Sequence, residues 1–162
     1  MDLKFALDNV VVPTLKLLPR YLDTPAARVL MLAIGLQESG FQDREQRGGG
    51  PAHSFWQLEM DGGVRGVCRH SGTTELARLA CRAQDCAFEP RAVWSQLAHD
   101  DLLGATFARL LLLTDPKPLP AANDAAAGWE YYQRNWRPGK PHPGTWDAVH
   151  AMNRDHAKEN DG

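Results

Sequence analysis

The stretch DTPAARVLMLAIGLQESGF, from Asp23 to Phe41, decides how the rest of the chain is expected to fold. Asp23 or Thr24 suits the cap of a helix, Pro25 suits its first turn, and Gly40 suits the left-handed position after its end. Apolar side chains lie on nearly every side of this helix, at Val29, Leu30, Met31, Leu32, Ala33, Ile34 and Leu36. Because a helix that is apolar all round is buried, the stretch predicts a central helix.

The remaining sequence predicts further helices separated by glycine and proline. The helical stretches are about 3–18 (bent or restarted at Pro13), 73–84, 89–115 with a break near 99–101, 122–136 and 145–157. A long loop over about 41–58 follows the central helix, and Pro116, Pro118 and Pro120 form a stiff linker. Alternating β-branched runs are absent, so we expect a mainly α fold in a single compact domain, 1–162, with a polar tail over about 154–162 that frays.

Composition narrows the classes of function. The chain has 162 residues and a formal net charge of −2, so no overall field attracts nucleic acid or an anionic membrane. The N-terminal segment carries Asp2, Lys4 and Asp8 within its apolar run, unlike a signal peptide, and no stretch reaches the roughly 18 apolar residues of a membrane span. We therefore expect a soluble protein without a nucleic-acid or membrane partner.

The three cysteines do not indicate a disulfide framework, because their number is odd. With His70 they make a spacing that matches no usual zinc pattern, so the sequence predicts buried thiols and neither a metal nor a cofactor. The cysteines are Cys68, Cys81 and Cys86.

Glu38 stands in the last turn of the central helix, where the chemistry of a carboxyl group changes. The end of a helix presents unsatisfied carbonyls and the negative end of the helix dipole, and Ile34 and Leu36 make the surroundings partly apolar. Both effects favour the neutral acid and raise its pKa, as a proton donor working near neutral pH requires. The alternative is an ordinary glutamate facing solvent.

Three short motifs occur one after another along the chain. Glu38-Ser39-Gly40-Phe41 ends the helix, Ser54-Phe55-Trp56-Gln57 closes the long loop, and Trp129-Glu130-Tyr131-Tyr132 lies in a late helix. In outline, 25–136 resembles the lysozyme-like superfamily, specifically soluble lytic transglycosylases and goose-type lysozymes. Those families carry Glu-Ser-x-Phe, then Gly-Leu-Met-Gln, then Ala-Tyr-Asn. The chain departs from them at Ser54, at the bulkier Phe55-Trp56 pair, and in having no asparagine after the tyrosine.

The resemblance implies a muramidase that cleaves the β-1,4 bond between N-acetylmuramic acid and N-acetylglucosamine in bacterial peptidoglycan, with Glu38 as the catalytic acid. Glu59 is the candidate second carboxylate, because goose-type lysozymes have an aspartate two residues after the motif glutamine; a helix-start charge is the alternative. The residues implied to bind substrate are Ser39, Phe41, Phe55, Trp56, Gln57, Tyr131 and Tyr132, with Tyr132 preferred over Tyr131 beside the acid.

Structural roles remain the alternative for these residues and for others near them. Phe55 and Trp56 either stack on sugar rings or fill the core, Gln57 either lines the cleft or caps the loop, and the aromatic residues of 129–136 have the spacing of core residues. Asp43, Glu45 and Asp61 are further acids near the loop, the first two beside Arg44 and Arg47 as solvated ion pairs. His53 and His70 are expected at the surface. Gly48, Gly49 and Gly50 let the loop close or simply turn.

The compact size, with no signal peptide or wall-binding module, would suit a phage-encoded enzyme. Such an enzyme is either an endolysin released from the cytoplasm through holin pores to the periplasmic wall, or a virion or tail component with other virion proteins as partners. The alternative function is a non-catalytic virion or wall-binding protein that retains the fold.

Overall fold

The predicted central helix is α3 (Pro25–Ser39) in the computed structural model of the chain, which describes residues 1–159. Thr24 is the N-cap, its Oγ1 accepting a hydrogen bond from the Ala27 amide at 3.1 Å. Gly40 ends the helix in the left-handed conformation with φ 62°. The predicted boundaries are therefore confirmed, with Thr24 as the cap, because Asp23 pairs with Arg28 instead.

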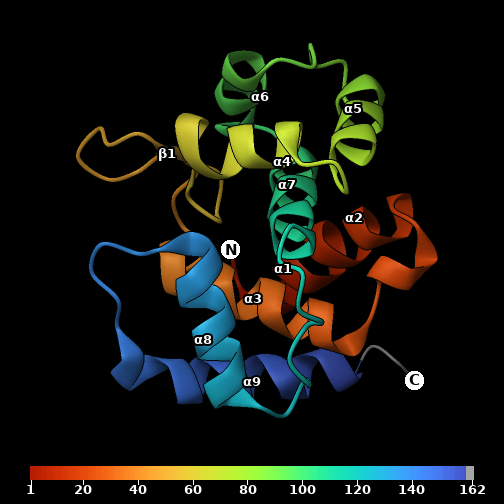
Figure 1. Ribbon diagram of the computed structural model, residues 1–162. Helices are drawn as coiled ribbons and strands as arrows, with labels where there is room; N and C mark the ends of the chain where they lie inside the picture. The colour runs from red at the N-terminus through yellow and green to blue at the C-terminus, as the bar shows by residue number, and fades with distance from the viewer. Residues whose placement is uncertain (160–162) are drawn as a thin grey trace.

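Helix α3 is buried because other helices cover it on several sides. It runs beside α9 (Pro143–Glu159), which lies along its length, and it meets α7 (Asp101–Leu113) and the N-terminal helical segment (Figure 1). Eight of its residues, from Ala27 to Gly35, are buried. The apolar ring read from the sequence thus reflects contacts on several faces of one helix.

The N-terminal segment is one bent helix. It consists of α1 (Leu3–Ala6), a π-helical turn η1 (Leu7–Val11) and α2 (Val12–Leu17), followed by the 3₁₀ turn η2 (Arg20–Leu22). Pro13 is the second residue of α2, so the chain lacks an amide donor next to the π-helical turn. The predicted helical segment over about 3–18 is confirmed, ending at Leu17.

Helix α7 forms the middle of the molecule, with shorter helices on one side and α3, α8 (Ala125–Trp136) and α9 on the other (Figure 1). The shorter helices are η3 (Met60–Val64), α4 (Arg65–Arg69), α5 (Thr74–Ala83) and α6 (Pro90–Leu97). Asp100 caps α7 by accepting a hydrogen bond from the Leu103 amide at 3.0 Å, which explains the predicted break near 99–101.

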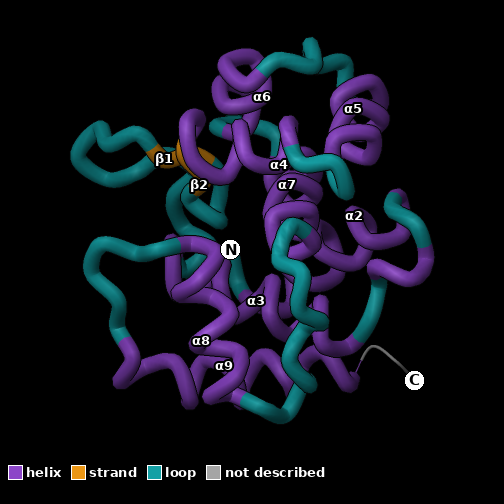
Figure 2. Tube along the Cα trace, in the orientation of Figure 1, coloured by secondary structure: helices purple, strands orange, loops and turns teal. Residues whose placement is uncertain are grey.

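A small antiparallel hairpin is the only sheet in the described part of the chain (Figure 2). Its strands are β1 (Ala52–His53) and β2 (Leu58–Glu59), in the register Ala52 opposite Glu59 and His53 opposite Leu58. Four residues, 54–57, connect them, so the aromatic-Gln motif is the turn of the hairpin.

The mainly α class is confirmed, and two local predictions are corrected. Residues 154–159 belong to α9 and do not fray, because Asn153 and Ala157 are buried; the rest of the predicted tail, 160–162, lies outside the described residues. The predicted helices also left out 60–69, where two glycines conceal the helical turns η3 and α4. Among residues 1–159, no helix has both the length and the apolarity of a membrane span.

Candidate active site

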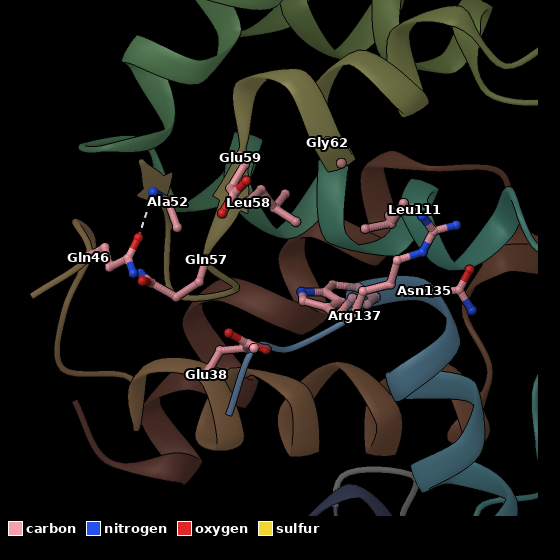
Figure 3. A pocket seen from close by; sticks show the side chains of 13 residues that line it. Glu38, Gln46, Ala52, Gln57, Leu58, Glu59, Gly62, Leu111, Asn135 and Arg137 are labelled. Atoms are coloured by element: carbon pink, nitrogen blue, oxygen red, sulfur yellow. Dashed lines mark hydrogen bonds between the residues drawn. The ribbon is translucent and has the colours of Figure 1, made fainter. Parts of the chain in front are cut away.

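An open cleft of about 340 Å³ lies between the end of α3, the hairpin, η3, α7 and the end of α8 (Figure 3). The helix end and the hairpin supply opposite walls, while α8 closes one end. Its lining residues are Glu38, Gln46, Ala52, Gln57, Leu58, Glu59, Gly62, Gly63, Leu111, Asn135, Trp136, Arg137 and Gly139.

The Glu38 carboxyl reaches the cleft from the last turn of α3 (Figure 3). Its Oε1 accepts a hydrogen bond from the Tyr132 hydroxyl at 2.6 Å. Burial raises the pKa of Glu38, and the Tyr132 hydrogen bond lowers it by less. The net upward shift favours the protonated acid, as predicted from the position of Glu38 at the end of a buried helix.

Tyr132 is held in place by aromatic packing. Its ring stacks on Trp146 of α9 with centroids 5.1 Å apart and an interplanar angle of 7°, and it also contacts Trp129 and Trp136. Burial and the neighbouring Glu38 raise the pKa of Tyr132, so its hydroxyl keeps its proton and acts as a donor. The tyrosine that contacts Glu38 is thus Tyr132, the residue preferred from the sequence.

Tyr131 does not belong to the cleft. Its hydroxyl lies near the carbonyls of Leu112 and Lys117, at 2.9 and 3.0 Å, and its ring is buried. Neighbouring residues of a helix point about 100° apart, so only one of the adjacent tyrosines can face Glu38. The prediction that Tyr131 binds substrate is corrected on this geometry.

Phe41, Phe55 and Trp56 are core residues, and their prediction as substrate-binding residues is corrected. Each side chain is at most 1% exposed, and the Phe41 ring lies 5.6 Å from both other rings. The indole Nε1 of Trp56 donates to the Met31 carbonyl at 2.8 Å, which ties the hairpin turn to α3. Gly35 makes room for the Phe41 ring, which would collide with any Cβ there. These rings cannot stack on a sugar.

Ser39 joins the helix end to the hairpin and does not line the main cleft. Its hydroxyl donates to the Phe55 carbonyl at 2.7 Å and accepts from the Phe41 amide at 3.1 Å. Together with Glu38 and Gln57, it lines a second depression beside the cleft. Ser39 therefore holds the helix end against the hairpin, and its role as a substrate contact stays a prediction.

Gln57 does line the cleft, in agreement with one of its two interpretations. Its Nε2 donates to the Ser54 carbonyl at 2.8 Å, so the same side chain also stabilises the turn. The turn holds Ser54 at φ 70° and Gln57 at φ 51°, a backbone region that favours glycine. Ser54 stands where the resembling families have glycine, and its hydroxyl accepts a hydrogen bond from the Trp56 amide at 3.1 Å.

Left-handed non-glycine residues gather around this cleft. Besides Ser54 and Gln57, Phe41 has φ 54° and Arg137 has φ 50°. The remaining example among the described residues, Asp85, lies elsewhere in the chain. Such backbone strain persists where surrounding contacts enforce it, and it concentrates at functional sites. Arg137 is the C-cap of α8 and Phe41 follows the C-cap of α3, where left-handed residues are common. Of these residues, Gln57 and Arg137 line the cleft.

Glu59 lies on the hairpin wall, opposite Glu38 (Figure 3). It is exposed and forms no ion pair with a described residue. The other candidate acids are engaged or lie elsewhere. Asp61 pairs with Arg65 at 2.7 Å and Asp43 with Arg47 at 2.6 Å, while the Glu45 carboxylate lies 3.8 Å from His53 Nε2. Glu59 also precedes η3, so both of its interpretations describe its position.

The expectation that both histidines lie at the surface is wrong for His53. His53 is buried, with Nδ1 at 2.7 Å from the Trp94 carbonyl and its ring stacked on Trp94 at 3.9 Å. His70 is partly exposed and accepts a hydrogen bond from the Gly72 amide at 2.9 Å. Neither ring lines the cleft.

Ten of the thirteen cleft residues were missing from the predicted site, among them the side chains of Gln46, Asn135, Trp136 and Arg137. Trp136 Nε1 donates to the Trp56 carbonyl at 2.8 Å, and Asn135 Nδ2 donates to Asp115 at 2.8 Å. Arg137 makes no ion pair with a described residue, and its side chain extends along the cleft (Figure 3). The basic turn 134–142 and the end of the tyrosine helix were the available signals for Arg137.

Arg44 forms a structural ion pair, and the thiols of Cys68 and Cys81 are buried. Arg44 pairs with Asp101 through two hydrogen bonds of 2.8 and 2.9 Å, so it anchors the long loop to α7 and forms no pair with Asp43 or Glu45. Burial raises the pKa of Cys68 to about 11 and of Cys81 to about 12, so both thiols stay protonated. Within 1–159, no group of three or more His, Cys, Asp or Glu side chains has the arrangement of a metal site.

Comparison with family models, with curated proteins and with solved structures gave no match to this chain. The structure thus defines a mainly α protein in which a partly buried acid and an exposed carboxylate face each other across an open cleft. Such a pair can donate a proton on one side of a bound bond and hold a water molecule or a cation on the other.

Proposed function

We propose that the protein cleaves the β-1,4 glycosidic bond between N-acetylmuramic acid and N-acetylglucosamine in bacterial peptidoglycan, with Glu38 as the proton donor. The observation that carries this proposal is the Glu38 carboxyl, which has a raised pKa, accepts a 2.6 Å hydrogen bond from Tyr132 and opens onto the cleft. The choice of substrate comes from the resemblance of the three sequence motifs.

Glu38 transfers its proton to the bridging oxygen while the bond to the anomeric carbon breaks. The electron pair of that bond goes to the leaving oxygen, and positive charge develops on the sugar ring. Glu38 becomes a carboxylate at this moment, and the Tyr132 hydroxyl donates to it. Burial thus keeps Glu38 protonated before the reaction, while Tyr132 stabilises the negative charge that the reaction creates on Glu38.

Two outcomes follow from the sugar cation. If the C6 hydroxyl of the muramic acid attacks, Glu38 takes back the hydroxyl proton and the product has a 1,6-anhydro end. If water attacks, Glu59 is the carboxylate that holds it on the opposite wall, and the product has a reducing end. We propose both routes for the same cleft and assign Glu59 a role only in the second.

The cleft continues along the loop side. A second depression of about 440 Å³ is also lined by Glu38, Gln46 and Gln57 and extends to Asp43 and Arg47. Gly48 and Gly49 adopt φ values of 79° and 78° at the exposed tip of the loop. An open surface on both sides of Glu38 suits a polymer better than a small enclosed ligand.

The test is loss of turbidity of exposed bacterial walls, comparing the wild type with Glu38→Gln and with Glu45→Gln. Glu45 is an exposed carboxylate that does not line the cleft, so its variant is the matched control. We expect clearing by the wild type and Glu45→Gln, and a loss of about 10²–10⁴ in rate for Glu38→Gln. Equal clearing by all three would remove Glu38 from its role.

Mass spectrometry of the digested glycan then separates the two outcomes. Products with 1,6-anhydro ends indicate cyclisation, and Glu59→Gln should leave their formation largely intact. Products with reducing ends indicate hydrolysis, and Glu59→Gln should abolish it. Wall sedimentation without clearing by the wild type would instead support the alternative of a non-catalytic wall-binding protein.

A further inference from the structure

Arg109 is a charged side chain buried in α7 that forms no ion pair within residues 1–159, although Asp23 interacts with it electrostatically. It is 4% exposed, and its Nε donates to the Leu22 carbonyl at 3.0 Å. Its Nη1 is enclosed and has no hydrogen-bond partner within residues 1–159. Burial lowers the pKa of Arg109, but a guanidinium in a protein does not give up its proton, so the charge persists.

The nearest acids are engaged by other residues. Both carboxylate oxygens of Asp23 accept hydrogen bonds from Arg28, at 2.9 and 3.2 Å. Asp115 accepts from Arg134 at 2.7 Å and from Asn135 at 2.8 Å, and these contacts help to hold its pKa low. A buried charge without a hydrogen-bonded acidic partner is costly, so an anion beside Arg109 would lower that cost.

Arg109 lines a pocket of about 400 Å³ that is separate from the cleft. The walls come from η2, the start of α3, α7, the loop that follows α7 and Tyr131 of α8. No lining residue is shared with the Glu38 cleft. Its apolar wall residues include Leu22, Leu112, Pro118 and Leu119. Lys117, at the rim, is exposed and forms no ion pair with a described residue.

Several hydrogen bonds hold the loop that walls this pocket. The Tyr131 hydroxyl lies 2.9 Å from the Leu112 carbonyl and 3.0 Å from the Lys117 carbonyl, which ties the loop after α7 to α8. Asp115 Oδ1 also accepts a hydrogen bond from the Lys117 amide at 2.9 Å. Prolines at 116, 118 and 120 further restrict the loop, which Figure 1 shows running from the end of α7 toward α8.

We propose that this pocket binds a small organic monocarboxylate with an apolar body. The carboxylate would accept hydrogen bonds from the guanidinium of Arg109, and the apolar body would replace water along the leucine and proline walls. A single negative charge matches the single buried cation, whereas a phosphate dianion would bring a second charge into apolar surroundings. Tyr131, which was predicted to bind substrate in the cleft, thus helps to shape this second pocket.

Hexanoate, 1-hexanol and inorganic phosphate are suitable probes, compared at equal ionic strength by two-dimensional NMR titration of the whole chain. We expect hexanoate to bind at least about tenfold more tightly than hexanol, because a hydrogen bond to a charged group is stronger than one to a neutral group. The shifted amides should include Leu112 and Leu119 and exclude the cleft residue Glu59. Phosphate should give no saturable shift in this pocket.

Two variants and a control test the assignment. Leu119→Trp should fill the pocket and abolish hexanoate binding, while Leu79→Trp, at a 52% exposed position on α5, should not. Arg109→Met should remove the preference for hexanoate over hexanol. Equal binding of the two probes, no hexanoate binding, or unchanged binding in Leu119→Trp would each overturn the proposal. Wall clearing does not enter the test, so failure here and failure of the proposed function are distinguishable.

Discussion

Glu38 and Arg109 are both ionisable groups withdrawn from water, yet the two regions around them deal with charge differently. Glu38 can become neutral by taking up a proton, and Tyr132 satisfies one of its oxygens in either state. Arg109 cannot become neutral, and only its Nε finds a protein partner among the described residues. Glu38 is therefore suited to donate a proton, whereas Arg109 stays a cation and is suited to bind an anion.

Beyond the loss expected for Glu38→Gln, the largest effect should come from shortening the acid while keeping its carboxyl group. Glu38→Asp moves the carboxyl away from the cleft by about one carbon–carbon bond, and misplacement on this scale costs about 10²-fold in rate. Turbidity clearing measures this loss, with Glu45→Asp as the control. Full activity in Glu38→Asp would mean that position matters little and would weaken the contrast with the fixed site of Arg109.

Removing the tyrosine contact should have the next largest effect. Because the Tyr132 hydrogen bond lowers the pKa of Glu38, Tyr132→Phe should raise it, and the alkaline limb of the pH–rate profile should move to higher pH. The rate should also fall by about tenfold, as expected for losing one hydrogen bond to a developing charge.

Tyr131→Phe is the matched control for this variant. It removes the contacts with the carbonyls of Leu112 and Lys117 and should lower stability by about 1 kcal/mol, with no shift of the pH profile. A pH shift of equal size in both variants would show that the effect is not specific to the hydroxyl beside Glu38.

Replacing the buried cation should change stability rather than activity. Arg109→Met removes an unpaired buried charge and one hydrogen bond, so the free energy of unfolding should stay unchanged or rise by up to about 2 kcal/mol. Denaturant unfolding measures this. Arg134→Met is the contrast, because it leaves Asp115 without its ion-pair partner and should be destabilising.

The smallest effect should be the pH-dependent stability of Glu38→Gln. Since burial raises the folded-state pKa of Glu38 above 4.5, ionising it costs folding free energy as pH rises through that pKa. The glutamine variant should therefore be more stable than the wild type at pH 8, by about 1 kcal/mol or less, with the gain absent at pH 3. A gain that is larger at pH 3 would contradict a raised pKa.

The elements that could be predicted from sequence are those decided by local chemistry. The caps and the apolar ring of 25–39 gave the central helix and placed Glu38 at its end, because these signals act within a few residues. The proline-rich linker and the cap at Asp100 are equally local. The helical turns over 60–69 escaped prediction because Gly62 and Gly63 weaken the pattern that tertiary contacts restore.

The composition of the site depended on directions that sequence order does not contain. The motif residues Phe41, Phe55 and Trp56 are adjacent to the cleft in sequence but face the core, where they position the hairpin against α3. Gln46 and Arg137 reach the cleft from segments that carry no motif. Whether a residue near a site points into it is decided by packing across elements, which no short motif encodes.

By itself, the sequence determined a mainly α chain, a buried helix from Thr24 to Gly40, and an acid at the end of that helix whose pKa is raised. The tertiary structure alone decided that Tyr132 and not Tyr131 contacts this acid, that Glu59 faces it, and that Arg109 is buried beside a second pocket. The physical reason is the distance along the chain over which each kind of interaction acts. Capping and helix propensity act over a few residues, whereas burial and electrostatic partnership require segments far apart in sequence to meet.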